Sequence, residues 1–344
     1  MRSFGKICVR VVRSSSGVIR GQHRTLTSSA SLASGGARSP QPNQPDDAGQ
    51  DQDTHFGFQQ VPSNLKKGMV KTVFSSVAHN YDVMNDLMSA GKHRYRSQKP
   101  IIRMHRLWKD DFVNMLGISS GWDVRSPPPK VLDVAGGTGD IAFRVADQLR
   151  PYMHSSGEEY SHDEDGADVP LLTVSDINPD MLEVGKQRAE DRFSSETLDS
   201  MQFVQADAEA LPFPDDTFHL YTIAFGLRNV TDMDKALREA HRVLRPGGRF
   251  MCLEFSRVPI APLRQAYDWY SFNVIPTIGQ AVARDRDAYQ YLVESIRMFP
   301  RQEELEDRMS TAGFKMVTHT NFTSGVVAVH SGFNMPHNRS QEAR

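Results

Sequence analysis

Apolar and polar residues follow one another along the chain in two distinct periods. In residues 66–88 the apolar positions recur at helical spacing, which predicts one helix. Further along, short apolar runs bounded by turn residues predict strands, and amphipathic stretches between them predict helices. The predicted strands are KVLDVA (130–135), LLTVS (171–175), MQFVQ (201–205), HLYTIAF (219–225) and RFMCLEF (249–255), and the helices between them are 140–150, 180–192 and 232–244.

Alternating strands and helices form a parallel sheet with helices on both faces. Arg245-Pro246-Gly247-Gly248 is expected to stop the third of these helices and to turn the chain into its strand. An aromatic-rich helical segment (263–299) and a helix (301–312) follow. Two β-like runs, FKMVTHTNF and VVAVHSGF, then flank Thr323-Ser324-Gly325. The pattern therefore predicts an α/β fold with one mostly parallel sheet and an antiparallel C-terminal hairpin strand at its edge.

The first 45 residues differ in composition from the rest of the chain. They contain no acidic residue before Asp46, they are rich in serine, and FGKICVRVVR can form a short basic amphipathic helix. This composition is typical of a mitochondrial transit peptide, and a disordered basic tail is the alternative. The basic residues of the segment are Arg2, Lys6, Arg10, Arg13, Arg20, Arg24 and Arg38. Residues 46–65, rich in Pro, Gln and Asp, are expected to be a linker before a domain at 66–333 and a disordered tail at 334–344.

The charge of the chain without this leader narrows the function classes. Removing seven of the 40 basic residues leaves 33 against 42 acidic ones, a net charge of −9. A nucleic-acid-binding protein needs the opposite sign. No run approaches the roughly 20 apolar residues that span a bilayer, so any membrane contact is expected to be peripheral. Residues 151–169 hold six of the acids and are expected to form a solvated loop, with a docking role as the alternative.

The candidate chemistry begins at VLDVAGGTGDIA (131–142), where a strand runs into glycines. The spacing satisfies the dinucleotide fingerprint, so a hydride-transfer enzyme is the first interpretation. In parallel sheets ligands bind at the carboxyl ends of the strands. Asp133 lies in the first strand, Asp176 ends the second and Asp207 follows the third. A dinucleotide enzyme needs only the second of these acids, whereas the set of three is the signature of S-adenosylmethionine-dependent methyltransferases.

The chemistry of S-adenosylmethionine explains this set. Because the molecule has no phosphate, the loop of Gly136, Gly137, Thr138 and Gly139 serves close backbone approach to its methionine and ribose parts. Asp176 can accept hydrogen bonds from both ribose hydroxyls. Asp207 and the amide of Ala208 are placed to read the adenine edge. The structural alternatives are that Asp176 caps a helix and that Asp207 is a turn residue.

Ten blocks of sequence make the resemblance to one family specific. They include YDVMNDLMS (81–89), HRLWKD (105–110), ALPFPDDTFH (210–219), FGLRNV (225–230) and YLVESIRMFP (291–300). Over nearly all of residues 66–333 the chain resembles the ubiquinone/menaquinone biosynthesis C-methyltransferases. The resemblance implies a Rossmann-like seven-stranded class I methyltransferase fold, S-adenosylmethionine as methyl donor, no metal, and a polyprenyl benzoquinol substrate attacked through a ring carbon.

The residues after the fourth predicted strand are the candidates for catalysis. Arg228 and Asn229 are placed to face the substrate, and because the pKa of arginine exceeds about 12 we expect Arg228 to order a water or to stabilise the quinolate rather than act as a base. The resemblance points to Arg228 and to Tyr81 as substrate-site residues. A surface salt bridge and a core aromatic are the structural alternatives for these two. Ala224 lies near the cofactor, where the family often carries a serine.

The leader and the resemblance together imply a location and a set of partners. The protein is expected in the mitochondrial matrix, peripheral on the matrix face of the inner membrane, where it binds other subunits of the ubiquinone-synthesis complex. Aromatic residues in 263–280 are expected to line the quinone pocket or to pack in the core or a homodimer seam. Two other functions stay open: methylation of a demethylmenaquinol, and a scaffold subunit that binds S-adenosylmethionine without turnover.

Residues 93–104 depart from the family pattern. They add about a dozen residues between Gly91-Lys92 and the HRLWKD block, bounded by a repeated His-Arg. One interpretation is a basic insertion that helps a lid meet anionic lipid. The other interpretation is that these residues were translated in error from the gene sequence and are absent from the functional protein.

Overall fold

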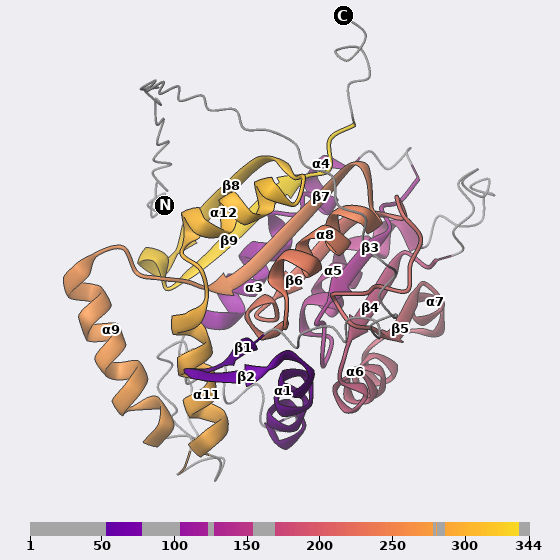
Figure 1. The fold of residues 1–344 in the computed structure, drawn as a ribbon. Helices are drawn as coiled ribbons and strands as arrows, with labels where there is room; N and C mark the ends of the chain where they lie inside the picture. The colour runs from indigo at the N-terminus through magenta and orange to yellow at the C-terminus, as the bar shows by residue number, and fades with distance from the viewer. Residues whose placement is uncertain are drawn as a thin grey trace, which may run out of the picture. The chain divides into compact units, whose positions relative to one another are not determined.

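The computed structural model describes residues 53–77, 104–122, 127–153, 169–277, 280 and 286–336. Several predicted features lie outside the described residues: the leader at 1–45, Tyr81, positions 93–103 of the insert and positions 154–168 of the acidic loop. The fold below is that of the described part of the chain, which is drawn in colour in Figure 1.

One sheet of seven strands organises the domain, in the order β5-β4-β3-β6-β7-β9-β8 (Figure 1). Strands β3 to β7 pair in parallel, and β9 pairs antiparallel with both β7 and β8. This confirms the predicted mostly parallel sheet with an antiparallel C-terminal hairpin at its edge. The strands are β3 (Val131–Val134), β4 (Leu172–Asp176), β5 (Met201–Gln205), β6 (Phe218–Ala224), β7 (Leu244–Phe255), β8 (Lys315–Phe322) and β9 (Val327–Phe333).

Helices cover both faces of the sheet because the strands are apolar on both. In β3, Val131 belongs to one hydrophobic core and Leu132 and Val134 belong to the other. The first core includes residues of α3 (Met104–Asn114), α4 (Ile118–Gly121), α5 (Asp140–Met153), α6 (Pro179–Arg192) and α11 (Arg286–Met298), and the second includes residues of α8 (Met233–Val243) and α12 (Gln302–Thr311). Such burial on both faces is what parallel strands require.

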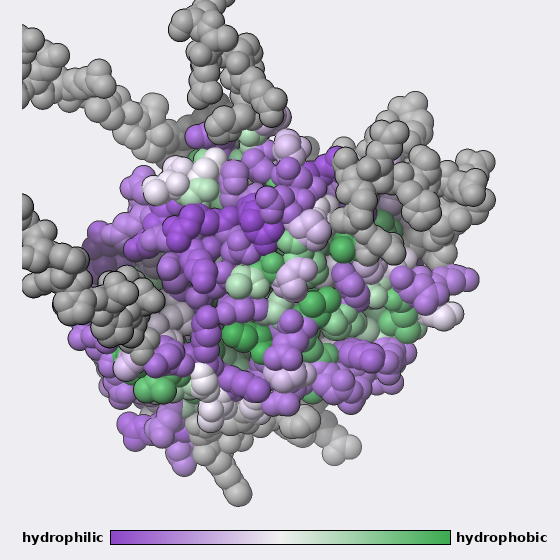
Figure 2. All heavy atoms as spheres, turned by 45° about the vertical axis from the view of Figure 1, so that its right-hand side comes forward, coloured by the Kyte–Doolittle hydropathy of each residue, from purple (hydrophilic) through white to green (hydrophobic). Residues whose placement is uncertain are grey.

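The remaining elements are short or lie at the rim. They are β1 (Asp53–Phe56), β2 (Gln59–Pro62), α1 (Ser63–Val77), α7 (Ser195–Asp199), η2 (Leu227–Asn229), α9 (Ala261–Asn273) and η3 (Thr323–Gly325). With the right-hand side of Figure 1 turned forward, the surface is mainly polar, with apolar side chains gathered in its lower centre and lower right (Figure 2). None of the helices in the described ranges is long and apolar enough to cross a membrane.

Residues 53–65 differ from the linker expected there, because they fold. β1 and β2 form an antiparallel hairpin that turns at Gly57, whose φ is +60°. The ring of Phe56 stacks on Tyr291 of α11 at 4.1 Å, and the hydroxyl of Thr54 donates to the carbonyl of Thr231. These contacts with distant segments order a stretch whose own sequence is too polar to predict strands.

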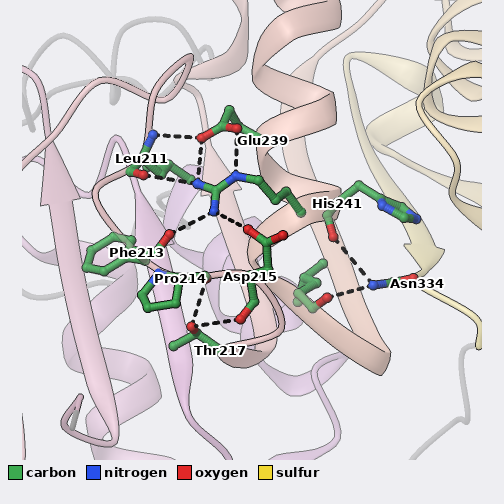
Figure 3. Close-up of polar contacts among 10 residues, drawn as sticks. Leu211, Phe213, Pro214, Asp215, Thr217, Glu239, His241 and Asn334 are labelled. Carbon is green, nitrogen blue, oxygen red and sulfur yellow. Dashed lines mark hydrogen bonds and ion pairs between the residues drawn. The ribbon is translucent and has the colours of Figure 1, made fainter. Parts of the chain in front are cut away.

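Three other boundaries also differ from expectation. Residues Arg245–Gly248 lie within β7, at an irregularity in its pairing with β6, rather than in a turn before it. The segment 263–299, expected to be helical, is divided between separate helices, since α9 ends at Asn273 and α11 begins at Arg286. Asn334, expected in a disordered tail, donates through Nδ2 to the carbonyl of Leu244 at 2.6 Å and is 8% exposed (Figure 3). The ordered domain therefore continues past β9.

Candidate active site

A cavity lies at the carboxyl ends of the central strands, where the sheet order reverses between β3 and β6. Such a switch point is the usual ligand site of an open parallel sheet. The loops after β3, β4, β5 and β6 all contribute to the wall, and α1 contributes from the other side. Of the predicted site residues, the lining includes Gly136, Gly137, Thr138, Asp176, Asp207, Ala208, Ala224 and Asn229.

The glycine loop after β3 passes very close to its neighbours. The Gly136 N–H donates to the carbonyl of Ser175, and a Cβ built at Gly136 would lie 2.6 Å from Cγ1 of Val174. Gly137 has a φ of +52°, which favours glycine. Gly139 does not line the cavity: the Phe143 ring fills the space beside it, 2.5 Å from where its Cβ would be. The glycines are therefore present for close backbone packing, with Gly136 and Gly137 facing the cavity.

Asp176 at the end of β4 accepts a hydrogen bond from a backbone N–H group at each of its carboxylate oxygens. Oδ2 accepts from the Gly137 N–H at 3.0 Å, and Oδ1 accepts from the Asn178 N–H at 2.8 Å. Burial raises the pKa of this carboxyl to about 6. The helix cap that was the structural alternative for Asp176 is supplied by Asn178, whose side chain accepts from the Asp180 N–H at the start of α6. Asp176 thus joins the glycine loop to β4 and still faces the cavity.

Asp133 in β3 is completely buried and lies beside the same loop. Its Oδ1 accepts from the Thr222 hydroxyl at 2.8 Å and the nearby Ala142 N–H also favours its charged form, while Oδ2 has no hydrogen-bond partner of normal length and angle among the described residues. Burial raises the pKa of this carboxyl to about 7. A buried polar atom without a partner at the wall of a cavity is an acceptor available to a ligand.

The loop after β5 meets helix α1. Lys67 Nζ lies 2.6 Å from Asp207 Oδ2 and 3.3 Å from Glu209 Oε2, and Lys66 Nζ donates to the Val230 carbonyl at 2.7 Å. The two lysines tie α1 to the ends of β5 and β6. Asp207 lines the cavity as predicted, but it is ion-paired with a residue that the sequence reading did not identify.

Arg242 of α8 fixes the loop that continues from Asp207 and Ala208. Its guanidinium donates to both oxygens of Glu239, to Asp215 Oδ1 and to the carbonyls of Leu211 and Phe213 (Figure 3). The hydrogen bond to Arg242 holds the pKa of Glu239 below its ordinary value. This arrangement anchors the ALPFPDD block to α8 and so supports the cavity wall from outside.

Arg228 is not where the sequence analysis expected it. Its guanidinium is 2% exposed, donates to Glu254 Oε1 at 2.8 Å and to the Phe225 carbonyl, and lies over the ring of Phe255. It does not line the cavity. The salt bridge offered as the structural alternative is present, but it is buried rather than at the surface, because Glu254 comes from the interior strand β7.

Asn229, the next residue, lines the cavity. Its Oδ1 accepts from the Tyr291 hydroxyl at 3.0 Å and its Nδ2 donates to the Phe225 carbonyl at 3.5 Å, so both ends of the amide are held within the fold and one Nδ2 hydrogen is left for a ligand. Sequence reading missed Tyr291, Glu254, Lys67 and Lys109, although two of them lie in the YLVESIRMFP and HRLWKD blocks. Within the described ranges, no three His, Cys, Asp or Glu side chains gather closely enough to hold a metal ion.

Comparison with known proteins shows the family of the chain. Residues 62–334 match the model of the ubiE/COQ5 methyltransferase family. The chain is 47% identical over 292 residues to the mitochondrial 2-methoxy-6-polyprenyl-1,4-benzoquinol methylase of Dictyostelium discoideum, covering 83% of this chain and 87% of that one. For the Homo sapiens protein of the same name the identity is 48% over 300 residues, covering 82% and 85%. The ubiquinone/menaquinone biosynthesis C-methyltransferase UbiE of Brucella abortus (strain S19) is 47% identical over 282 residues, covering 81% and 90%. The chain therefore belongs to the ubiE/COQ5 methyltransferase family and is an S-adenosylmethionine-dependent methyltransferase.

Proposed function

We propose that the chain methylates 2-methoxy-6-polyprenyl-1,4-benzoquinol at a ring carbon, giving the 5-methyl product in ubiquinone biosynthesis. The observation that carries the proposal is the 47–48% identity, over more than 80% of both chains, to methylases named for that substrate. The cavity at the switch point, with its glycine loop and three carboxylates, is the site proposed for the reaction.

The residues of the cavity fit the methyl donor. S-adenosylmethionine supplies an electrophilic methyl group on a positively charged sulfur. Asp133 and Asp176 are carboxyls beside the glycine loop, and Oδ2 of Asp133 still lacks a hydrogen-bond partner among the described residues. Negative charge at this point favours the sulfonium over its neutral product. Asp176 has lone pairs left for the ribose hydroxyls beyond its two backbone bonds.

The acceptor side of the site must help a phenol ionise. A phenol with a pKa of about 10 needs about three units of assistance at neutral pH, or roughly 4 kcal/mol. Asn229 is the polar residue of the η2 turn that faces the cavity, held there by Tyr291, and we propose that it binds the quinol oxygen. Arg228, paired with Glu254 behind the wall, is then a positioning residue that fixes the Phe225 carbonyl and the turn carrying Asn229. Tyr81, outside the described residues, stays a prediction for the substrate site.

We place the protein in the mitochondrial matrix, peripheral on the inner membrane. The basic leader supports this location, as do the relatives named as mitochondrial. The exposed apolar side chains at α9 support contact with the membrane surface, with other subunits of the ubiquinone-synthesis complex or with a second copy of the chain. They are Ile260, Leu263 and Trp269, the last of which is 65% exposed.

Methyl transfer to a short-tailed 2-methoxy-1,4-benzoquinol tests the proposal. The expected product carries one new methyl group on carbon, identified by mass and by NMR. A parallel reaction with a demethylmenaquinol tests the second candidate, which the name of the Brucella relative favours. Binding of S-adenosylmethionine without turnover of either quinol would contradict both and support the scaffold alternative.

Complementation tests the predicted insert. A strain lacking the methylase would receive the full chain or a chain without residues 93–104. Rescue by the shortened chain alone would mark the insert as foreign to the functional protein, whereas rescue by the full chain alone would mark it as part of the lid.

A further inference from the structure

We propose that Lys109 of α3 binds the carboxylate of the methionine part of S-adenosylmethionine. The inference rests on the proposed use of this donor, and it assigns a residue that the sequence analysis did not consider. It starts from the position of the side chain: Lys109 is 3% exposed, lines the cavity, and lies 2.5 Å from Asp140 Oδ2.

Lys109 lies at the glycine-loop end of the cavity. Its partner Asp140 is the first residue of α5, directly after Gly139. The glycine loop is the part of this fold that approaches the methionine portion of the donor. Asp133, with its unpartnered Oδ2, lies ahead of the same loop and offers the negative charge that an α-ammonium group needs. An amino acid in this position requires one anion and one cation, and Lys109 supplies the cation.

The hydrogen-bonding capacity of Lys109 is not used up within the described residues. An ammonium group has three N–H donors, and the only partner that the described residues give it is Asp140. Burying an ammonium with unsatisfied donors is costly unless a further acceptor arrives. The cavity that Lys109 lines is where such an acceptor can come from.

Lys109 belongs to a small cluster of charged side chains. Asp140 pairs with both Lys109 and Arg144, and Arg144 also pairs with Asp110, so two carboxylates face two cations. Burial alone would raise the pKa of Asp140, but the charges of Lys109 and Arg144 outweigh it and hold that pKa well below its usual range. Asp140 is therefore ionised throughout the physiological range and fixes the Lys109 ammonium at the wall of the cavity.

The two other lysines of the cavity are placed differently. Lys67 is already paired with Asp207 and Glu209, at the loop after β5. Lys71 on α1 is exposed, so its ammonium can remain hydrated. Lys71 is the matched control, since it is a lysine of the same cavity that lacks the burial and the position beside the glycine loop.

The test compares two ligands that differ only in the carboxylate. Calorimetry on the full chain would measure the affinities for S-adenosylmethionine and for decarboxylated S-adenosylmethionine. We expect the wild-type protein to bind S-adenosylmethionine more tightly than the decarboxylated ligand. Lys109→Met should weaken the binding of S-adenosylmethionine by about 10- to 100-fold and leave the affinity for the decarboxylated ligand unchanged. Lys109→Arg should keep part of the preference, and Lys71→Met all of it.

A purely structural role for Lys109 gives a different result. If Lys109→Met weakened both ligands equally, or kept the wild-type preference, the lysine would serve only to hold α3 on α5 and the inference would be overturned. Retained binding of the decarboxylated ligand also reports that the variant is folded. If wild type bound neither ligand, the proposed function would itself be wrong.

Discussion

Arg228 Nη1 lies 2.8 Å from Glu254 Oε1, and the two side chains are 2% and 1% exposed. Removing one member of a buried ion pair leaves the other charge uncompensated, at a cost of about 3–5 kcal/mol. We expect Arg228→Met to lower the free energy of unfolding by that amount and the double variant Arg228→Met/Glu254→Met to recover most of it. Denaturant titration of the three proteins measures both effects. Equal stability of wild type and Arg228→Met would contradict a buried pair.

Substitution of Arg228 should also affect turnover and donor binding differently. In Arg228→Ala protein that remains folded, affinity for S-adenosylmethionine should stay near the wild-type value while turnover falls, because Arg228 supports the turn carrying Asn229 and does not line the cavity. Calorimetry gives the affinity and the quinol assay gives the rate. A loss of donor binding instead would place the arginine in the cofactor site.

Donor binding should depend on pH between about 5.5 and 7.5. Burial raises the pKa of Asp133 to about 7 and that of Asp176 to about 6, so the ligand-free fold holds protons that the unfolded chain has already lost. These two groups therefore make the ligand-free protein less stable as pH rises from about 4 to 7. A bound cation favours the ionised forms, so binding should release protons and tighten as pH rises.

Calorimetry in two buffers with different heats of ionisation measures that proton release directly. S-adenosylhomocysteine, which lacks the positive charge on sulfur, is the control and should release fewer protons. Identical heats in both buffers at pH 6.5 would show that neither carboxyl changes its ionisation on binding.

Gly136→Ala should abolish donor binding. A methyl group there would lie 2.6 Å from Val174 Cγ1 and 3.0 Å from Asp133 Oδ2, so the loop would have to move away from β4. Gly68→Ala in α1 is the control, because nothing lies within 4 Å of its Cβ position and alanine favours a helix interior by about 0.5–1 kcal/mol. Thermal shifts with and without S-adenosylmethionine report both variants. A ligand-induced shift in Gly136→Ala as large as in wild type would refute the close packing.

Tyr291→Phe removes a single hydroxyl from the site. The ring can keep its stacking on Phe56, so stability should fall by only about 0.5–1.5 kcal/mol, while Asn229 loses the hydrogen bond that holds its Oδ1 and keeps the longer contact of Nδ2 with the Phe225 carbonyl. Turnover of the quinol should fall with donor affinity unchanged. Wild-type turnover in this variant would mean that the orientation of Asn229 does not matter to the reaction.

The sequence predicted the sheet well because its signals are local. Each central strand is a short apolar run and each helix an amphipathic one, so Asp133, Asp176 and Asp207 could be placed in sheet order from spacing alone. The β1–β2 hairpin was missed because its order comes from Tyr291 and Thr231, far away in the chain.

The surroundings of the site residues could not be predicted for the same reason. Arg228 is turned inward by Glu254, a residue of the next strand, and Asp207 is engaged by Lys67 from a helix 140 positions earlier. Local patterns say that a side chain is charged and follows a strand. They do not say which opposite charge the fold brings beside it.

The antiparallel pairing of β9 has a consequence for how the domain can be completed. Val327–Phe333 lies between β7 and β8, and the first six of its seven residues are buried. The strand that is reached last along the described chain is thus an internal one. A chain that ends before β9 leaves the edge of β7 unpaired. Such an edge can pair with other chains, which is a known route to aggregation. The seven-stranded sheet can therefore be completed only after β9 has been synthesised and has paired with β7 and β8.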